Sequence, residues 1–135
     1  MNIELCECSS EYWEFVRQVR TDPSNQNGFF SHSEITPEQQ IEYMKSNSFR
    51  YKICILNNSP VGYIGIIKNN EITYCVQSKH KGKGIGTLML KEFSKGLTEL
   101  EAFVKCENIS SQKVFEKLGW EKQIYYKLRN KWKEK

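Results

Sequence analysis

The spacing of apolar and polar positions predicts that the chain begins with a strand followed by two helices. Residues 3–8 alternate apolar side chains with acidic or cysteine side chains, which is typical of a half-buried strand. Ser9 or Ser10 can then cap a helix. The apolar positions that recur along this helix are Tyr12, Trp13, Phe15, Val16 and Val19. A second helix is expected from the N-cap residue Thr36 through about Lys45, because a proline and a glutamate follow the threonine directly.

The middle of the chain predicts a sheet, because three β-rich runs are joined by turns short enough for an antiparallel meander. These runs are residues 51–56, 61–67 and 71–76. Helical spacing returns at Ile85, Leu88, Met89, Phe93 and Leu97. The remaining expected elements are a strand at 101–106, a helix from about Ser110 to Leu118 and a strand at 120–129. The order β-α-α-β-β-β-α-β-α-β predicts an α/β (α+β) fold with a mixed, mostly antiparallel central sheet flanked by about four helices.

Length and composition allow one domain that spans residues 1–135. The 135 residues are 39% hydrophobic and 13% aromatic, which is enough to close one core, whereas two domains usually need a longer chain. No apolar run approaches the ~20 residues that span a bilayer, and the N-terminus lacks the order of a secretory signal. We therefore expect a cytoplasmic protein with no membrane partner.

The cysteines and histidines indicate neither a metal site nor a disulfide framework. The five cysteines are an odd number without a C-x-x-C pair, and the two histidines lie far apart without ligand spacing. The formal net charge of +4 permits an anionic ligand. It does not require nucleic acid, for which a clearly more basic domain is expected.

One glycine-rich stretch, VQSKHKGKGIGTLMLKEF at residues 76–93, lies where the last strand of the meander passes into a helix. A helix N-terminus offers unpaired backbone N–H groups, and Gly82, Gly84 and Gly86 remove side chains that would keep a phosphate away. The stretch lacks G-x-x-x-x-G-K-S/T, and the strands before it form hairpins rather than the βαβ unit of a dinucleotide fingerprint. Taken by itself, the loop is either an anion site or a plain glycine-rich turn.

Two ordered motifs surround this loop. KGKGIG resembles the pyrophosphate motif Q/R-x-x-G-x-G/A of the GNAT superfamily of acyl-CoA N-acyltransferases, with Lys81 in the Gln/Arg position and Gly84 and Gly86 as its glycines. Further along, the chain resembles that family's N-x-x-A/S-x-x-L/V-Y/F-x-K-x-G-F/W pattern. The matching residues are Asn108, Ser111, Val114, Phe115, Lys117, Gly119 and Trp120. The element order also fits a single GNAT-like domain across nearly the whole chain.

The resemblance implies acetyl-CoA as cosubstrate, bound without a metal ion. In the family, a bulge at the end of the fourth strand opens a gap to the fifth, and the pantetheine arm lies there like an added strand. The implied cofactor-binding residues are Cys75, Val76, Gln77, Lys81, Gly82, Lys83, Gly84, Ile85, Gly86, Thr87, Asn108, Ser111 and Phe115. A backbone N–H near Val76 or Gln77 can polarise the thioester carbonyl. Simple helix capping remains the alternative role of Asn108 and Ser111.

The family's chemistry is direct attack of an amine on the thioester in a ternary complex, which needs no covalent enzyme intermediate. Glu71, which opens the fourth strand, is the candidate base, and an exposed turn glutamate is the alternative interpretation. Many members carry a tyrosine acid where this chain has Phe115, whose ring cannot donate a proton. Tyr74, Tyr126 or an ordered water would then supply the proton, or the thiolate leaves without one.

The acceptor is expected to bind the first part of the chain, because the later part carries the coenzyme motifs. Residues 1–50 would form the acceptor-binding half, residues 51–128 the sheet and acetyl-CoA-binding half, and residues 129–135 a basic tail. The Asp-Pro pair after arginine and the I-T-P-E helix start resemble the acceptor region of members that acetylate amino-sugar nucleotides. A protein N-terminus, such as that of a ribosomal protein, is the nearest rival acceptor.

Two sets of polar side chains suit different acceptors. The hydroxyls and phosphates of a sugar nucleotide suit Arg17, Arg20, Asn25, Asn27 and His32. A cationic polyamine or peptide amine suits Glu34, Glu38 and Glu42. Two other classes stay open: a catalytically silent acyl-CoA sensor, consistent with Phe115, and a nucleic-acid-binding module that uses the basic tail with Trp132. A homodimer is compatible with the prediction.

Overall fold

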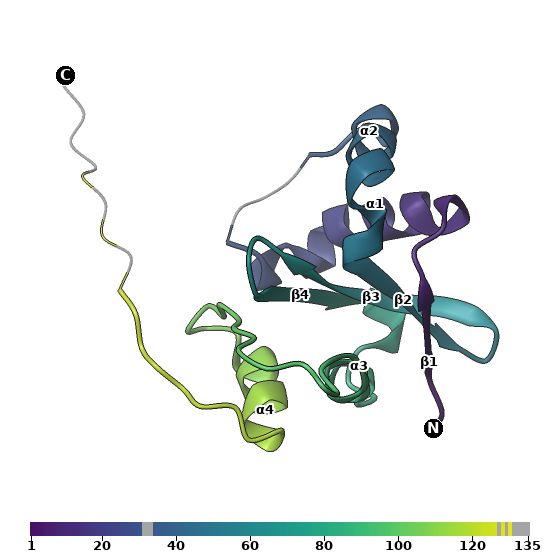
Figure 1. Ribbon diagram of the computed structural model, residues 1–135. Coiled ribbons are helices and arrows are strands. Elements are labelled where there is room, and N and C mark those ends of the chain that lie inside the picture. Colours follow the sequence, from purple (N-terminus) through teal and green to yellow (C-terminus); the bar gives the residue numbers. More distant parts are fainter. Residues whose placement is uncertain (31–33, 127, 129, 131–135) are drawn as a thin grey trace.

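Four antiparallel strands form the centre of the molecule in the computed structural model, which describes residues 1–30, 34–126, 128 and 130 (Figure 1). In sheet order the strands are β1 (Glu4–Glu7), β2 (Tyr51–Leu56), β3 (Ser59–Ile67) and β4 (Glu71–Val76). Asn57 and Asn58 form the turn between β2 and β3 with φ of 50° and 64°, the left-handed conformation that tight hairpin turns of this kind require. The predicted meander is confirmed.

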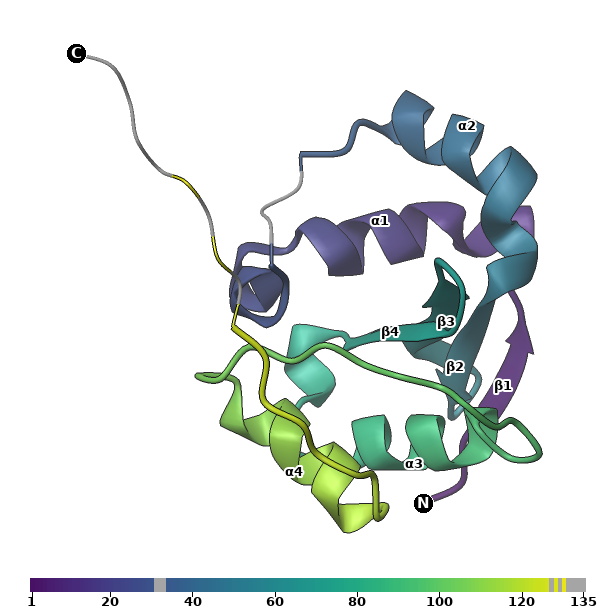
Figure 2. The ribbon, with the colours of Figure 1, turned by 60° about the vertical axis from the view of Figure 1, so that its left-hand side comes forward.

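Helices cover both faces of this sheet (Figure 2). On one face lie α1 (Trp13–Thr21) and α2 (Pro37–Asn47), and on the other lie α3 (Ile85–Phe93) and α4 (Ile109–Lys117). The short 3₁₀ turns are η1 (Ser10–Tyr12), η2 (Pro23–Gly28), η3 (Ser48–Arg50) and η4 (Ser78–His80). Within the described residues, no helix is long and apolar enough to cross a membrane. The fold is a mixed α+β domain of the predicted class.

The start of α2 follows the sequence prediction, whereas the start of α1 does not. Thr36 Oγ1 accepts a hydrogen bond from Gln39 N–H at 3.1 Å, and Gln39 Oε1 accepts one from Thr36 N–H at 2.9 Å. This capping box satisfies two backbone donors that a helix start leaves without partners. Ser9 precedes η1 without a side-chain capping bond, and its hydroxyl donates to Glu11 Oε1 at 3.1 Å. The helix α1 begins only at Trp13.

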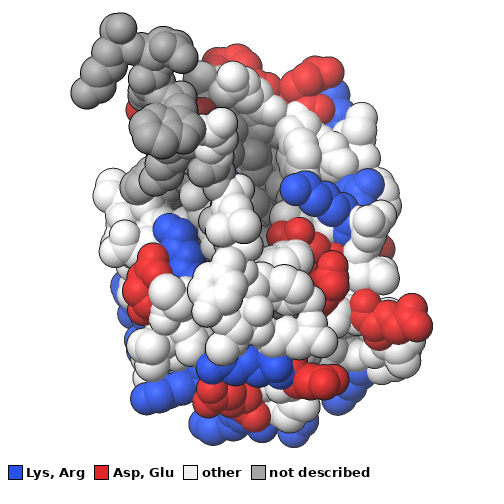
Figure 3. All heavy atoms as spheres, turned by 90° about the vertical axis from the view of Figure 1, so that its left-hand side faces the viewer, with Lys and Arg blue, Asp and Glu red and all other residues white. Residues whose placement is uncertain are grey.

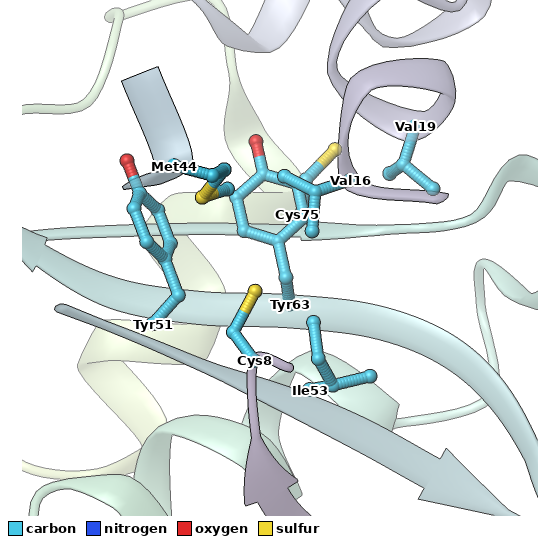
Figure 4. Packing of buried hydrophobic residues seen from close by; sticks show 8 residues of the cluster. All are labelled: Cys8, Val16, Val19, Met44, Tyr51, Ile53, Tyr63 and Cys75. Atoms are coloured by element: carbon cyan, nitrogen blue, oxygen red, sulfur yellow. The ribbon is translucent and has the colours of Figure 1, made fainter. Parts of the chain in front are cut away.

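Two apolar clusters, one on each face of the sheet, form the core. The cluster beneath α1 and α2 contains Cys8, Val16, Val19, Met44, Tyr51, Ile53, Tyr63 and Cys75 (Figure 4). The cluster beneath α3 and α4 contains Cys54, Val61, Ile64, Ile72, Ile85, Met89, Leu90 and Phe115. Successive side chains of a strand point to opposite faces, so neighbours such as Ile53 and Cys54 join different clusters.

Two predicted strands do not form in the described residues. Residues 101–106 meet β4 only through one parallel bridge between Glu71 and Glu101. No described strand includes residues 120–129, and the side chains of Ile124 and Tyr126 are 73% and 85% exposed. Strand propensity expresses packing against neighbouring strands, and within the described residues neither segment pairs with a strand beyond the single bridge at Glu101.

One edge of β4 is consequently open. The strands β3 and β4 pair in a regular register from Glu71 to Val76, and the register shift in the sheet lies between Cys54 and Ile55 of β2. The prediction of a bulge at the end of the fourth strand is therefore wrong. The edge is open because the chain after Glu101 makes no further bridge to β4 within the described residues.

Candidate active site

The loop between β4 and α3 presents several backbone N–H groups together. Gly84 is the N-cap residue of α3, and Leu88 N–H donates to Gly84 O at 3.2 Å. The N–H groups of residues 85–87 therefore precede the first helical hydrogen bond and lie at the positive end of the helix dipole. Gly82 and Gly84 have φ of 79° and 81°, which glycine adopts without strain. A Cβ atom on either glycine would meet nothing within 4 Å, so there is open space beside the loop.

Gly86 has a different role, which is close packing. A Cβ atom at Gly86 would lie 3.2 Å from the Tyr74 ring, closer than ordinary van der Waals contact. The missing side chain lets the first turn of α3 rest directly on β4. Of the three glycines that the sequence singles out, two allow the backbone conformation of the loop and one fixes the distance between helix and strand.

The edge of β4 that faces away from β3 carries unpaired backbone groups. Ile72 N–H points to this edge, where it donates to Glu101 O at 2.8 Å, and Gln77 N–H points the other way, to a β3 carbonyl at 2.8 Å. Alternate residues of a strand direct their backbone groups to the same side, so the N–H and C=O groups of Tyr74 and Val76 face the open edge. No backbone group meets them within the described chain. Of the two candidate carbonyl-polarising groups, Gln77 N–H is already paired and Val76 N–H is available.

Asn108 caps α4 with its side-chain oxygen, and its side-chain nitrogen is not used by the cap. Its Oδ1 accepts hydrogen bonds from Ser111 N–H and Ser110 Oγ, both at 3.2 Å. Its Nδ2 has no hydrogen-bond partner among the described residues and faces Gly28, where a Cβ atom would lie 3.6 Å away. The capping role of Asn108 is therefore observed, and its amide nitrogen remains available for a second contact.

Tyr74 brings a hydroxyl group to the side of α4 that carries Phe115. Tyr74 Oη and Ser111 Oγ are 2.9 Å apart, and the rings of Tyr74 and Phe115 pack edge to face with centroids 6.0 Å apart. Burial raises the pKa of Tyr74, and the hydrogen bond with Ser111 offsets part of that rise. The phenol therefore stays protonated at neutral pH and can donate a proton.

The other two catalytic candidates lie apart from Tyr74. Glu71 is half-buried at the start of β4. Side chains alternate between the two faces of a strand, so Glu71 points to the face opposite that of Tyr74, three residues further along. Tyr126 lies in the exposed terminal stretch, and the structure does not bring it to the other candidates. Cys75 shares the face of Glu71, and burial raises the pKa of its thiol to about 11, so it is protonated and unreactive at neutral pH.

Two arginines of α1 have different surroundings. Arg17 Nε donates to Glu14 Oε1 at 2.7 Å, and another Arg17 nitrogen donates to Ile35 O at 3.0 Å, so this guanidinium is engaged within the protein. The Arg20 guanidinium carbon lies 3.5 Å from the centre of the Phe29 ring. This distance is that of a cation–π contact between the guanidinium and the ring.

The remaining acceptor candidates are placed differently. Asn25 is buried: its Nδ2 donates to Val19 O at 2.8 Å, and its Oδ1 has no partner in the described part of the chain. Asn27 is exposed, and His32 lies outside the described residues. The three acidic candidates, all exposed, are Glu34, Glu38 and Glu42.

Two contacts that we did not anticipate from the sequence join residues 22–28 to the loop after β4. Ser78 Oγ donates to Asp22 Oδ2 at 3.5 Å, and Lys81 Nζ donates to Ser24 O at 3.3 Å. Hydrogen bonds from Ser24 hold the pKa of Asp22 below its usual value, with smaller effects of Ser78 and Lys81. The only sequence signal was the Asp-Pro pair, which is typical of a turn start and does not name its distant partners.

A hollow of about 460 Å³ lies between α3 and α4. It is lined by Thr87, Lys113, Val114, Glu116 and Lys117. The hollow adjoins the first turn of α3 and carries two cationic side chains against one anionic side chain. Among the described residues, no group of three or more His, Cys, Asp or Glu side chains could hold a metal ion.

Comparison with known proteins bears on these features. Residues 4–121 match the model of the family described as acetyltransferase (GNAT) domain. A solved GNAT-family acetyltransferase from Bacillus anthracis is 23% identical, with a TM-score of 0.73 over 93% of this chain and 84% of that chain. Spermidine N-acetyltransferase from Vibrio cholerae, in complex with CoA and spermine, is 14% identical, with a TM-score of 0.73 over 87% and 79% of the two chains. Ribosomal-protein-alanine N-acetyltransferase from Brucella melitensis is 16% identical, with a TM-score of 0.72 over 88% and 83%.

The family match covers most of the chain, and it agrees with the sheet and the glycine loop described above. The chain belongs to the GNAT acetyltransferase family. It is an acetyl-CoA-dependent N-acetyltransferase, and the identity of its acceptor has to be argued from its own residues.

Proposed function

We propose that this enzyme transfers the acetyl group of acetyl-CoA to the primary amine of an amino-sugar nucleotide by direct attack in a ternary complex. The observation that carries the transfer is the open edge of β4 that leads into the glycine loop. The pantetheine amides pair with the backbone of Tyr74 and Val76 as an added strand would. The pyrophosphate lies on the N–H groups of residues 85–87, with Lys81 and Lys83 beside it.

Contacts at the two ends of the coenzyme extend this arrangement. Asn108 Nδ2 has no hydrogen-bond partner among the described residues, so it can donate to the pantetheine arm. The hollow between α3 and α4 carries Lys113 and Lys117 next to Thr87, which supports it as the place of the adenosine end with its 3′-phosphate.

The chemistry uses both faces of β4. The amine nitrogen attacks the thioester carbon, and Val76 N–H stabilises the oxyanion that forms. Glu71 takes the proton of the attacking nitrogen, directly or through water. When the carbon–sulfur bond breaks, Tyr74 Oη donates its proton to the departing sulfur from the opposite face. Water then reprotonates Tyr74, and Glu71 releases the amine proton to solvent. Tyr126 is the alternative donor. Because its side chain is exposed in the terminal stretch, we favour Tyr74 as the donor.

Arg20 supports a phosphate-bearing acceptor. Its guanidinium carbon lies over the Phe29 ring, and its charge acts on the thiol of Cys75, which puts it near the end of β4. A planar guanidinium matches the oxygens of a phosphate group.

A cationic polyamine or a peptide amine is the second candidate acceptor. The observation in its favour is the run of three exposed carboxylates before and along α2, which are Glu34, Glu38 and Glu42. The names of two structurally similar proteins, a spermidine and a ribosomal-protein-alanine N-acetyltransferase, agree with this candidate. Arg20 argues against it, because a guanidinium repels a cationic acceptor.

Thiol release from acetyl-CoA, measured against amino-sugar nucleotides, polyamines and short peptides, tests the proposal. We expect the amino-sugar nucleotide to be the fastest acceptor, and Arg20→Gln to raise its KM by about tenfold. Arg50→Gln is the matched control, since Arg50 also lies over an aromatic ring, that of Phe49, at 5.1 Å. Faster turnover of polyamines or peptides favours the second candidate, and tight coenzyme binding without any turnover favours the acyl-CoA sensor.

A nucleic-acid-binding module receives less support. On the face shown in Figure 3, basic and acidic side chains are interspersed and do not form a single basic stripe. A phosphate backbone is bound by clustered lysine and arginine side chains. Most of the basic tail, including Trp132, lies outside the described residues.

The domain halves, the location and the assembly belong to the same proposal. Residues 1–50 would serve the acceptor and residues 51–128 the sheet and coenzyme. Five free cysteines support a reducing compartment such as the cytoplasm.

Exposed apolar side chains in the terminal stretch support a homodimer; they include Ile124, Tyr125 and Leu128. Light scattering on the purified protein tests this assembly.

A further inference from the structure

Residues 22–28, here called the acceptor loop, form a self-supporting unit at the end of α1. Asp22 Oδ1 accepts hydrogen bonds from Ser24 N–H at 2.9 Å and Ser24 Oγ at 2.8 Å. The buried Asn25 donates to Val19 O, and Gln26 Nε2 donates to Arg20 O at 2.7 Å. These hydrogen bonds tie the loop to the last turn of α1.

This unit touches both coenzyme motifs. At one end, Asp22 and Ser24 contact Ser78 and Lys81 of the loop after β4. At the other end, Gly28 faces the amide of Asn108 at the start of α4. In Figure 2 the coil of residues 23–28 lies at the same end of the sheet as the loop after β4 and the start of α4. The acceptor loop thus spans the mouth of the site between the two motifs.

We propose that Asp22 is a positioning residue that fixes the acceptor loop to the coenzyme loop, so that binding of the coenzyme pyrophosphate orders the acceptor side of the site. The proposal rests on the proposed placement of the pyrophosphate beside Lys81. The carboxylate has the geometry for this role, because Oδ1 closes its own loop and Oδ2 reaches across to Ser78.

Lys81 supplies the coupling. Its ammonium group already donates to Ser24 O, and an ammonium has three donors. A pyrophosphate oxygen can occupy a second donor while the first keeps Ser24 O, so the bound anion holds the lysine and, through it, the acceptor loop. A ligand shifts a conformational equilibrium only through such a difference in contacts between the two states.

Hydrogen exchange of the backbone amides tests this inference without an acceptor. We expect coenzyme A to slow exchange of residues 22–28 in the wild type by about fivefold or more, which is the lower range of typical coupling between two sites. Asp22→Ser keeps an N-cap oxygen but removes the oxygen that reaches Ser78. Asp22→Ser and Ser78→Ala should each reduce the factor by which coenzyme A slows this exchange. The double variant should reduce that factor no further than Asp22→Ser alone.

The control is Glu11→Gln, since Glu11 also accepts a hydrogen bond from a serine, Ser9, but at the far end of α1. It should respond to coenzyme A as the wild type does. With a competent amine, Asp22→Ser should raise the acceptor KM by about tenfold and leave the dissociation constant of acetyl-CoA within about twofold. Unchanged exchange of residues 22–28 on coenzyme binding, or a full response in Asp22→Ser, overturns the inference even when acetyl transfer is observed. Failure of acetyl transfer with the exchange response intact overturns the proposed function alone.

Discussion

At the scale of single residues, the candidate proton donor Tyr74 lies against the start of α4. Ser111 and Phe115 are four residues apart in α4 and so lie on one face of the helix. The position that carries a tyrosine in many members of the family is Phe115 here, and Tyr74 reaches the same helix face from β4. A hydroxyl group is thus present at this place, although it comes from a different element.

This arrangement predicts the effect of moving the hydroxyl. Coenzyme A is a good leaving group, with a thiol pKa near the value of about 8.5 for free cysteine, so the wild type should be active. Phe115→Tyr should change kcat by less than about tenfold, and Tyr74→Phe should lower it by about a hundredfold. Tyr126→Phe is the control and should be neutral. A nearly inactive wild type that gains about a hundredfold from Phe115→Tyr would contradict this account and favour the sensor.

Glu71 gives a second prediction at this scale. If it accepts the amine proton, Glu71→Gln should lower kcat by about a hundredfold or more and displace the acidic limb of the pH–rate profile, with little change in coenzyme affinity. Glu101→Gln is the matched control, because Glu101 bridges to Glu71 at the same edge of the sheet. Full activity of Glu71→Gln with an unchanged profile would return Glu71 to the role of a turn residue.

At the scale of elements, the glycine loop at the start of α3 is the proposed binding site of the coenzyme pyrophosphate. Gly84→Asp should weaken acetyl-CoA binding at least tenfold, because it places a negative charge beside the anion and strains a residue whose φ is 81°. Gly96→Asp is the control: its φ is 74° and a Cβ atom there also meets nothing within 4 Å, but it follows α3. Isothermal titration with acetyl-CoA measures both variants. Equal affinities of the wild type and Gly84→Asp would contradict binding at this loop.

The two helix starts on the other face of the sheet make a matched pair. Thr36→Ala removes the capping box of α2 and should lower the free energy of unfolding by about 1 kcal/mol. Ser9→Ala should have a clearly smaller effect, because Ser9 makes no side-chain capping bond. Urea denaturation followed by circular dichroism measures both. Similar losses in the two variants would show that the capping geometry does not matter here.

At the scale of the whole molecule, the two clusters protect most of the cysteines. Burial raises the pKa of the Cys8, Cys54 and Cys75 thiols to about 11, whereas Cys106 is exposed. Titration with dithionitrobenzoate at pH 8 should therefore label Cys106 quickly and those three only after denaturant is added. Cys106→Ser should lose the fast phase. Fast labelling of a buried cysteine in the native protein would mean that its cluster is looser than described.

At this scale, the difference between local patterns and contacts of distant segments explains what could be predicted from the sequence. Periodicity, turn residues and the coenzyme motifs depend on neighbours along the chain, so the meander, α2 and the glycine loop were predictable. The contacts of Tyr74 with Ser111 and of Asp22 with Ser78 join distant segments, and no local pattern encodes them. The expected strands at 101–106 and 120–129 failed for a related reason, because a strand needs a partner that its own sequence does not specify.

The open edge of β4 has a consequence for the protein before it meets its coenzyme. A strand with unpaired N–H and C=O groups is a template for another chain, and the groups of Tyr74 and Val76 are available for such pairing. If the pantetheine arm occupies this edge, acetyl-CoA is also a cap against aggregation. The concentration of the cosubstrate would then govern how long the folded protein persists as well as how fast it works.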